Sequence, residues 1–225
     1  MSSATLRPIF GGFRSSKGVN PYGGLGLAEG MTSTSDRAGR TTPVRFALFV
    51  DRDGTLNPDL HYLKDAERLE LNRGVGEALH LARDHGYLIV CVTNQSGLER
   101  GLYTREDVER THTRLNELLR AHRAHVDAFY YCPHTPEHGC DCRKPGTGLF
   151  EQARRDWNID FAGSAVLGDR SLDVEAGRAL GLLTAIVMPR GHEADVAAEL
   201  AERSVVPDIS ATSFRGAVYR VLARG

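Results

Sequence analysis

Short apolar runs alternate with helical patterns along most of this chain. The runs "FALFV" (46–50), "YLIVCV" (87–92) and "LTAIVM" (183–188) have the length and composition of buried strands. Between the first two lies "VGEALHLARDHG" (75–86), whose apolar residues recur on one helical face before a glycine. Continuous apolar strands joined by helices build sheets that are covered on both faces. We therefore predict an α/β fold with a doubly wound parallel sheet.

The remaining pattern repeats this alternation. Thr104, with Asp107 three residues later, predicts a capped helix that runs to about residue 125. Further strands are predicted at 127–131 and 165–168, further helices at 148–157 and 172–180, and from about residue 192 a helix, a short strand near Pro207 and a closing helix.

The domain organisation follows from a change in composition near residue 43. Residues 1–42 are rich in Gly, Ser, Thr and Arg and lack periodicity, so we predict a flexible N-terminal tail. The many glycines argue against an amphipathic organelle transit peptide. Residues 43–225 have the length and apolar content of one globular domain.

The net charge and the lengths of the apolar runs limit which partners and which cellular compartment we expect. A formal net charge of −1 supplies no basic face to neutralise nucleic-acid phosphates. No apolar run approaches the length of a membrane span, and the N-terminus lacks the apolar core of a signal peptide. We therefore expect a cytoplasmic protein that binds neither nucleic acid nor membrane.

Polar and charged residues follow the predicted strands, at the edge where such sheets bind ligands. Carboxylates and other hard oxygen ligands suit Mg²⁺, and a cation pair suits a phosphoryl group. Each motif alone is compatible with an ordinary turn or loop, but the set in this order favours a phosphoryl-transfer site. The set comprises Asp51, Asp53, Thr93, Asn94, Gln95, Arg143, Lys144, Asp169 and Asp173.

These residue types suggest a two-step reaction. Asp51 would attack phosphorus to form an aspartyl phosphate. Asp53 would protonate the leaving oxygen and then deprotonate the attacking water. Mg²⁺ held by Asp51 and Asp169 would offset the repulsion between nucleophile and substrate, and Thr93 and Lys144 would bind the oxygens where charge accumulates.

A cysteine and histidine run precedes the cation pair. Cys132, His134, Cys140 and Cys142 spell C-x-H-x5-C-x-C, a ligand set that closes a tetrahedral structural Zn²⁺ site. His138 could replace His134, and the lack of C-x-x-C argues against a redox role. Cys91 is predicted to be a buried apolar residue. Six other histidines are predicted to lie on ordinary surface: His80, His85, His112, His122, His125 and His192.

Four motifs together resemble those of the haloacid dehalogenase (HAD) superfamily of phosphatases. They are "FVDRDGTLN", "VTNQSG", "CRKP" and "GDRSLD", and the match covers nearly all of residues 46–190. The resemblance implies an HAD-like domain over 43–225 with a zinc-binding loop at 132–142. It implies Mg²⁺ bound by the carboxylate of Asp51, the backbone carbonyl of Asp53, and Asp169. About forty residues separate Asp51 from Thr93, too few for a separate cap domain, and small uncapped members are often monomers.

Within the superfamily, "TNQSGLERGLY" and "YYCPH…CDCRKP" resemble one branch. Its members remove the 7-phosphate of D-glycero-D-manno-heptose 1,7-bisphosphate during nucleotide-activated heptose synthesis. The resemblance implies a small phosphorylated sugar as substrate, although Arg170 stands where Lys is common and Leu60 where Gly is common. The substrate-binding residues that we expect are Arg52, Asp59, His61, Tyr62, Asn94, Gln95, Ser96, Arg100, Arg143 and Arg170.

Two alternatives stay open at this point. Histidinol-phosphate phosphatases share the scaffold and a short Cys/His loop, and "TNQSGLERG" favours the heptose branch over them. A catalytically inactive interaction module is disfavoured by the complete carboxylate set.

Overall fold

The computed structural model describes residues 33–35, 41–188 and 191–224. The chain divides into two compact units, Met1–Val44 and Arg45–Gly225. In the first unit, β1 (Ser33–Ser35) and β2 (Thr41–Pro43) pair as antiparallel strands. The sequence did not predict this ladder, because short polar strands leave no apolar periodicity. The rest of the predicted tail lies outside the described residues, so the tail stays a prediction.

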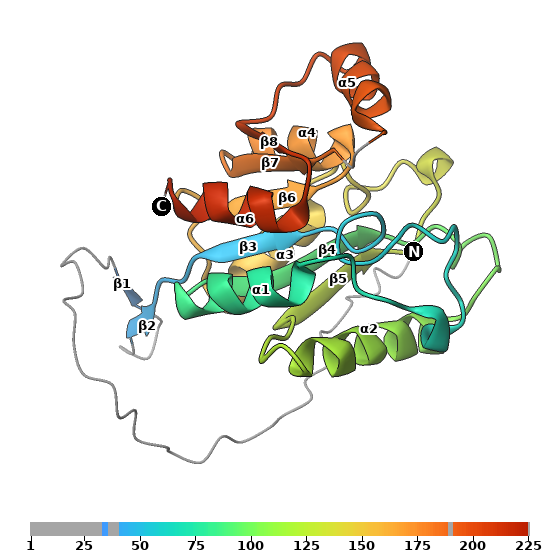
Figure 1. Ribbon diagram of the computed structural model, residues 1–225, viewed down its shortest axis with the longest axis horizontal. Helices are drawn as coiled ribbons and strands as arrows, with labels where there is room; N and C mark the ends of the chain where they lie inside the picture. Colours follow the sequence, from blue (N-terminus) through green and yellow to red (C-terminus); the bar gives the residue numbers. More distant parts are fainter. Residues whose placement is uncertain (1–32, 36–40, 189–190, 225) are drawn as a thin grey trace. The chain divides into compact units, whose positions relative to one another are not determined.

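A parallel sheet forms the centre of the second unit (Figure 1). In its described part, six strands lie in the order β5-β4-β3-β6-β7-β8, and every neighbouring pair is parallel. The strands are β3 (Ala47–Val50), β4 (Leu88–Asn94), β5 (Ala128–Cys132), β6 (Ala165–Gly168), β7 (Leu183–Val187) and β8 (Ile209–Ala211).

Helices cover both faces of this sheet (Figure 1). Residues of α1, α2 and α6 belong to the core on one face, residues of α3 and α4 to the core on the other, and α5 packs near α4. The helices are α1 (Val75–Asp84), α2 (Arg105–Arg120), α3 (Gly148–Trp157), α4 (Ser171–Ala179), α5 (Glu193–Glu202) and α6 (Phe214–Leu222), with the 3-10 turns η1 (Ala66–Arg68) and η2 (Pro136–His138). The prediction of a doubly wound α/β sheet is therefore confirmed.

The alternation of side chains along β3 explains the two cores. Leu48 and Val50 point into one apolar cluster, whereas Ala47 and Phe49 point into the other. The Phe49 ring lies 5.1 Å from that of Phe150 in α3, between ring centroids. A strand buried on both faces reads as a continuous apolar run, which is why the sequence located it.

Helix α2 matches the predicted start but not the predicted end. Thr104 and Asp107 form the expected reciprocal capping box, and the helix ends at Arg120 rather than near residue 125. The prediction that His112 lies on ordinary surface is wrong. Its side chain is only 7% exposed, and its ring stacks on Phe129 of β5 at 4.2 Å between centroids.

Strand order places the functional edge. From β3 the chain moves outward through β4 to β5 and then returns to β6 on the other side of β3. The loops that leave β3, β4 and β6 therefore lie at the carboxyl ends of the strands, next to the point where the strand order reverses, and such sheets bind ligands there. Among the described residues, no helix combines the length and the apolar composition that crossing a membrane requires.

Candidate active site

Three carboxylates converge at the carboxyl ends of the central strands. Asp51 follows β3, Asp169 follows β6, and Asp173 lies in the first turn of α4. One oxygen from each lies within 4.8 Å of the others. The turn after β3 allows this approach because Gly54 has φ +80°, and a Cβ atom there would lie 2.1 Å from Asp169 Oδ2. The Thr55 hydroxyl donates to Asp169 Oδ1 at 2.9 Å and orients this carboxylate.

Lys144 brings a single positive charge into this cluster. Its ammonium group lies 2.9 Å from Asp51 Oδ1 and 2.6 Å from Asp173 Oδ1, and it donates to the Val92 carbonyl at 2.8 Å. The side chain is 3% exposed. Three acceptors match the three protons of an ammonium group, so the Lys144 ammonium is fully satisfied in a fixed position against Asp51.

The electrostatics of the cluster favour a bound cation. Burial raises the pKa of Asp51 to about 6, since the lowering by Lys144 does not offset burial and the repulsion from Asp173 and Asp53. Burial and the charges of Asp51 and Asp173 raise the pKa of Asp169 well above its ordinary value. Carboxylate oxygens with uncompensated negative charge are the donors that Mg²⁺ prefers, so Asp51 and Asp169 fit this ion.

Asp53 has a different environment from Asp51. Burial alone would raise the pKa of Asp53, but Arg52, with hydrogen bonds from Asn57 and Gln95, lowers it below its ordinary value. Arg52 donates to both carboxylate oxygens, at 3.1 Å from Nε to Oδ1 and at 2.7 Å from Nη2 to Oδ2. The side chain of Arg52 is 1% exposed, and that of Asp53 is 25% exposed.

Two residues predicted to bind substrate have other partners. Arg52 and Gln95 are buried, and both hydrogen-bond to Asp53 rather than facing solvent. Their hydrogen-bonding groups face a neighbouring carboxylate because the motif "DRDGT" folds back on itself after β3. In this structure both hold Asp53, and their predicted contact with substrate stays a prediction.

Asn94, Arg170 and Thr93, also predicted at the site, each have partners within the protein. Asn94 donates to the Lys144 carbonyl at 3.2 Å and accepts from the Lys144 amide at 3.0 Å, so it fixes the backbone that carries this lysine. Arg170 is 57% exposed in its side chain and pairs with Glu199 of α5 at 2.8 Å. The Thr93 hydroxyl lies at the end of β4 and accepts from Gln95 at 3.1 Å.

The other predicted substrate residues lie on loops. Asp59, His61 and Tyr62 are exposed in the loop after β3, where His61 and Tyr62 have left-handed φ angles of 47° and 57°. A cavity of about 500 Å³ lies between this loop and the start of α2. Ser96 and Arg100 lie in the loop after β4, where Ser96 is half-buried and Arg100 is exposed.

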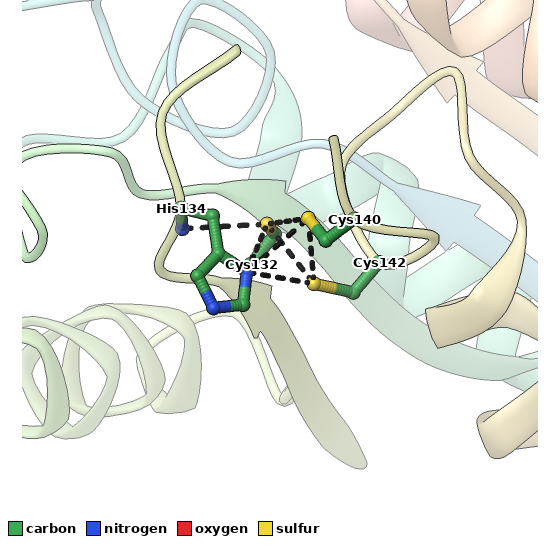
Figure 2. Close-up of side chains that lie close together, drawn as sticks. All are labelled: Cys132, His134, Cys140 and Cys142. Carbon is green, nitrogen blue, oxygen red and sulfur yellow. Dashed lines mark hydrogen bonds between the residues drawn. The ribbon is translucent and has the colours of Figure 1, made fainter. Parts of the chain in front are cut away.

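Cys132, His134, Cys140 and Cys142 form a compact cluster beside the active site (Figure 2). The three sulfur atoms lie 3.1 to 3.6 Å apart, too far for a disulfide. His134 Nδ1 lies 3.2 Å from the sulfurs of Cys140 and Cys142 and 3.6 Å from that of Cys132. Tetrahedral ligands about 2.3 Å from zinc are separated by about 3.8 Å, so this cluster can hold a zinc ion after slight expansion.

His138 does not join the thiols. Its ring stacks on that of His134 at 3.9 Å, and its Nδ1 lies 2.7 Å from Glu99 Oε1. Glu99 also accepts a hydrogen bond from the Thr135 amide. The structure thus favours His134 over His138 as the ligand, and Glu99 joins the loop after β4 to the zinc-binding loop.

Sequence reasoning missed several residues that build this site. Thr55 and Asn57 hold Asp169 and Asp53 respectively, and both lie within the motif that carries the nucleophile. Their proximity to Asp51 was the available signal, but Thr and Asn in a turn carry no distinctive spacing. Tyr103 donates to Gln95 within the segment after β4, and Glu99 contacts His138 in the zinc-binding loop; no sequence pattern indicates either contact.

The loop that carries Arg143 and Lys144 also touches the zinc-binding cluster. Arg143 Nη1 donates to the His134 carbonyl at 3.0 Å. The backbone N–H of Gln95 donates to the Cys132 carbonyl at 2.7 Å. The metal-binding loop therefore contacts Arg143, which precedes Lys144, and Gln95, which lies two residues after Thr93.

Comparisons with known proteins agree with this architecture. A family model described as HAD-hydrolase-like matches residues 141–215. A crystal structure of D,D-heptose 1,7-bisphosphate phosphatase from B. bronchiseptica, determined with magnesium and phosphate, superposes with a TM-score of 0.71. It is 27% identical in sequence, and the match covers 80% of this chain and 99% of that one.

Curated relatives are more similar in sequence. D-glycero-beta-D-manno-heptose-1,7-bisphosphate 7-phosphatase of Haemophilus ducreyi is 39% identical over 171 residues, covering 71% of this chain and 94% of that protein. D-glycero-D-manno-heptose-1,7-bisphosphate 7-phosphatase of Chlorobaculum tepidum is 37% identical, covering 72% and 86% respectively. Given these matches and the HAD-like sheet, the chain belongs to the D-glycero-D-manno-heptose-1,7-bisphosphate 7-phosphatase family of HAD-like hydrolases.

Proposed function

We propose that this enzyme hydrolyses the 7-phosphate of D-glycero-D-manno-heptose 1,7-bisphosphate, giving heptose 1-phosphate for nucleotide-activated heptose synthesis. The observation that carries the proposal is the pairing of Asp51 with the buried Lys144 beside Asp169. Its relatives' names supply the substrate, and the motifs around these residues supply the chemistry. Residues 43–225 would form the phosphatase domain.

Asp51 acts as the nucleophile. One of its oxygens attacks phosphorus as the bond from phosphorus to the leaving oxygen breaks, which forms an aspartyl phosphate. Lys144 keeps Asp51 ionised and oriented, because an adjacent ammonium favours the charged carboxylate. The positive charge of Lys144 would stabilise the phosphoryl oxygens on which charge accumulates, and the Thr93 hydroxyl at the end of β4 would donate to one of them.

Asp53 acts as the general acid and then as the general base. It gives a proton to the leaving oxygen in the first step. In the second step it takes a proton from the water that attacks phosphorus, and the bond to Asp51 breaks to release inorganic phosphate. One residue can serve both steps because each leaves it in the protonation state that the other needs.

The inner cluster consists of Asp51, Asp169, Asp173 and Lys144, and two of its carboxylates would help to hold Mg²⁺. The carboxylates of Asp51 and Asp169 and the backbone carbonyl of Asp53 are the proposed ligands, and Thr55 orients Asp169 for this role. The bound ion supplies positive charge that offsets the repulsion between the anionic nucleophile and the phosphate. Asp173 has one oxygen on Lys144 and the other 3.3 Å from the Arg170 amide, so we assign it to positioning Lys144.

We assign Cys132, His134, Cys140 and Cys142 to one structural zinc ion. All four positions of a tetrahedron come from protein, which leaves no position for a reacting water. The zinc-binding loop carries Arg143 and Lys144 directly after its last ligand, so the metal would fix the loop that presents both cations.

The rest of the substrate would be recognised by loop residues that are exposed or half-buried. Asp59, His61 and Tyr62 on one side and Ser96, Arg100 and Arg143 on the other flank the strand ends. A sugar that carries a second phosphate provides bulk over a site that has no separate cap domain. Arg170 is assigned to Glu199, as its ion pair indicates.

A panel of substrates tests the proposed function. Phosphate release is measured with Mg²⁺ from both anomers of heptose 1,7-bisphosphate and from histidinol phosphate. We expect heptose bisphosphate to have the highest kcat/KM. Phosphorus NMR of the product should show that the 1-phosphate is retained. Faster turnover of histidinol phosphate would replace the proposal with that activity, and no turnover of any substrate would favour an inactive module.

That the enzyme is monomeric and cytoplasmic stays a prediction. Light scattering coupled to size-exclusion chromatography would measure the mass in solution, and fractionation of the source cells would locate the protein.

A further inference from the structure

Both oxygens of Asp53 are held by donors from within the protein. Besides the two bonds from Arg52, Asn57 donates to Oδ1 at 3.0 Å, and Gln95 Nε2 donates to Oδ2 at 2.8 Å. These donors come from the turn after β3 and from the end of β4. The carboxylate is therefore fixed against rotation while its side chain keeps access to solvent.

The orientation of the Gln95 amide follows from the chemistry of Arg52. A guanidinium group only donates hydrogen bonds, and Arg52 Nη2 lies 3.1 Å from Gln95 Oε1. The oxygen of the amide must therefore face Arg52. Gln95 Nε2 then faces Asp53 Oδ2 and the Thr93 hydroxyl, to which it donates at 2.8 and 3.1 Å.

Tyr103 contacts the same oxygen of the Gln95 amide as Arg52 does. Its side chain is buried, and its hydroxyl lies 2.7 Å from Gln95 Oε1. Because Oε1 can only accept, the Tyr103 hydroxyl donates. Burial raises the pKa of Tyr103 to about 12, so the hydroxyl keeps its proton at neutral pH.

The network also sets the direction of the Thr93 hydroxyl. Thr93 Oγ1 accepts from Gln95, so its own hydrogen remains available to donate elsewhere. Thr93 is the residue proposed above to donate to a phosphoryl oxygen. One glutamine amide thus orients both the acid/base carboxylate and a phosphate donor.

We infer that Tyr103 and Arg52 are positioning residues for catalysis. Tyr103 holds the Gln95 amide and through it Asp53 and Thr93, and Arg52 holds both this amide and Asp53 itself. The inference rests on the proposed function, since it assigns a purpose to contacts with the acid/base group. Tyr103 acts only through the Gln95 amide, whereas Arg52 contacts the Asp53 carboxylate directly, and neither is assigned a contact with the phosphoryl group. Each acts by fixing the direction in which Asp53 delivers its proton.

The test uses the dependence of the first step on the leaving group. With an alkyl phosphate, the leaving oxygen is strongly basic and needs the proton from Asp53 as its bond to phosphorus breaks. With p-nitrophenyl phosphate, the phenolate leaves without a proton. A misplaced Asp53 should therefore slow phosphoenzyme formation from the alkyl phosphate far more than from the aryl phosphate.

The experiment compares Tyr103→Phe with a matched control, Tyr130→Phe. Tyr130 is also buried, and its hydroxyl binds Asp156 at 2.9 Å, outside the network around Asp53. Rapid-quench single turnovers give the rate of phosphoenzyme formation from heptose bisphosphate and from p-nitrophenyl phosphate. For Tyr103→Phe we expect a loss of about tenfold to 100-fold with the sugar phosphate, little loss with the aryl phosphate, and an unchanged KM.

Arg52→Lys provides the second variant. It keeps the charge but loses the two-pronged contact with Asp53, so the same selective loss should be larger than for Tyr103→Phe. Equal losses on both substrates in these variants, or a ratio like that of Tyr130→Phe, would overturn the inference.

Failure of the proposed function would look different. The wild-type enzyme would then release no phosphate from heptose bisphosphate while still hydrolysing p-nitrophenyl phosphate. The ratio would be measured with β-glycerol phosphate as the alkyl substrate, so the positioning role is tested in either case.

Discussion

Asp51 and Asp53 lie two residues apart, yet their carboxylates occupy opposite electrostatic environments. Burial raises the pKa of Asp51 to about 6, while Lys144 lowers it. Burial of Asp53 is more than offset by Arg52 and by two side-chain amides, which lower its pKa. The two carboxylates on one turn therefore have different cationic neighbours, Lys144 for Asp51 and Arg52 for Asp53.

Replacing Asp51 with Asn tests its assignment as nucleophile. The amide preserves shape but cannot form an acyl phosphate, so Asp51→Asn should lose turnover by on the order of 10⁴-fold or more. The fold should persist because Lys144 keeps its contacts with Asp173 and Val92. Circular dichroism checks the fold, and phosphate release checks turnover.

Asp156→Asn is the matched control for this substitution. Asp156 accepts the hydroxyl of Tyr130 at a distance from the inner cluster, so this variant should keep wild-type turnover. Residual activity in Asp51→Asn within tenfold of wild type would remove Asp51 from the covalent step.

At the scale of residues, the sequence predicted which residues lie at the site better than it predicted their contacts. Asp51, Asp169 and Lys144 were identified because parallel strands end at one edge. The partners of Arg52, Gln95 and other motif residues depend on side-chain directions within a tight turn. Such directions arise from packing across the fold, which spacing in the sequence does not encode.

At the scale of elements, the zinc-binding loop contacts other loops around the site. Glu99 and Arg143 connect it to the loop after β4 and to the segment that carries Lys144. A metal that closes this loop would fix the segment that carries Lys144 without taking part in chemistry.

Metal analysis and two histidine variants test this arrangement. The purified enzyme should contain about one zinc ion per chain. His134→Gln should lose zinc, melt at a lower temperature and have a lower kcat/KM at saturating Mg²⁺, measured by elemental analysis, calorimetry and phosphate release.

His138→Gln serves as the control, because its ring only stacks on His134 and pairs with Glu99. This variant should keep its zinc. Zinc retained by His134→Gln but lost by His138→Gln would exchange the two assignments, and a fully active zinc-free enzyme would contradict a structural metal.

Element boundaries differ in how well the sequence located them. Helix α3 and strand β6 coincide with their predicted ranges. Helix α3 ends before Asn158, whose φ is 52°, and the apolar run of β6 lies between the polar residues Ser164 and Asp169. The end of α2 was placed about five residues too late, because "AHRAH" (121–125) is compatible with helix but turns at Arg123, whose φ is 56°. A local reversal without glycine gives little warning in the sequence.

At the scale of the whole molecule, the buried His112 makes the stability of the fold depend on pH. Burial, with a further contribution from Arg52, lowers its pKa well below the ordinary value of 6.5, while Asp53 opposes the shift. Its ring lies between α2 and β5, against Phe129 and near Tyr131. The folded protein therefore keeps this imidazole neutral where the unfolded chain would protonate it.

The sign of the resulting pH dependence is fixed. Below about pH 6.5 the unfolded chain binds a proton at His112 that the folded protein does not, so stability falls as the pH falls. The slope from this residue should be up to about 1.4 kcal/mol per pH unit. Urea unfolding between pH 5 and pH 7 should show a shallower slope in His112→Gln than in the wild-type enzyme.

Replacing the exposed His192 with Gln should leave that slope as in the wild-type enzyme, since its side chain is 70% exposed. Equal slopes in His112→Gln and wild type would contradict the assignment of this pH dependence to His112.

The overall architecture was predictable because strand burial on both faces leaves continuous apolar runs, and right-handed crossovers leave few topologies. The location of His112 was not, because a polar residue in a helix is exposed far more often than it is buried. Its burial requires the aromatic surface of β5, and that contact joins segments that the sequence analysis treated separately.

The environment of Lys144 has a practical consequence for covalent labelling. The sequence contains three lysines, Lys17, Lys64 and Lys144. Lys64 is exposed, whereas the Lys144 amine is buried and its proton affinity is increased by Asp173 and Asp51 despite its burial. Amine-reactive dyes and surface coupling require an accessible, unprotonated amine, so they would spare Lys144. The enzyme can therefore be attached to a support through lysine with its phosphoryl-binding cation unmodified.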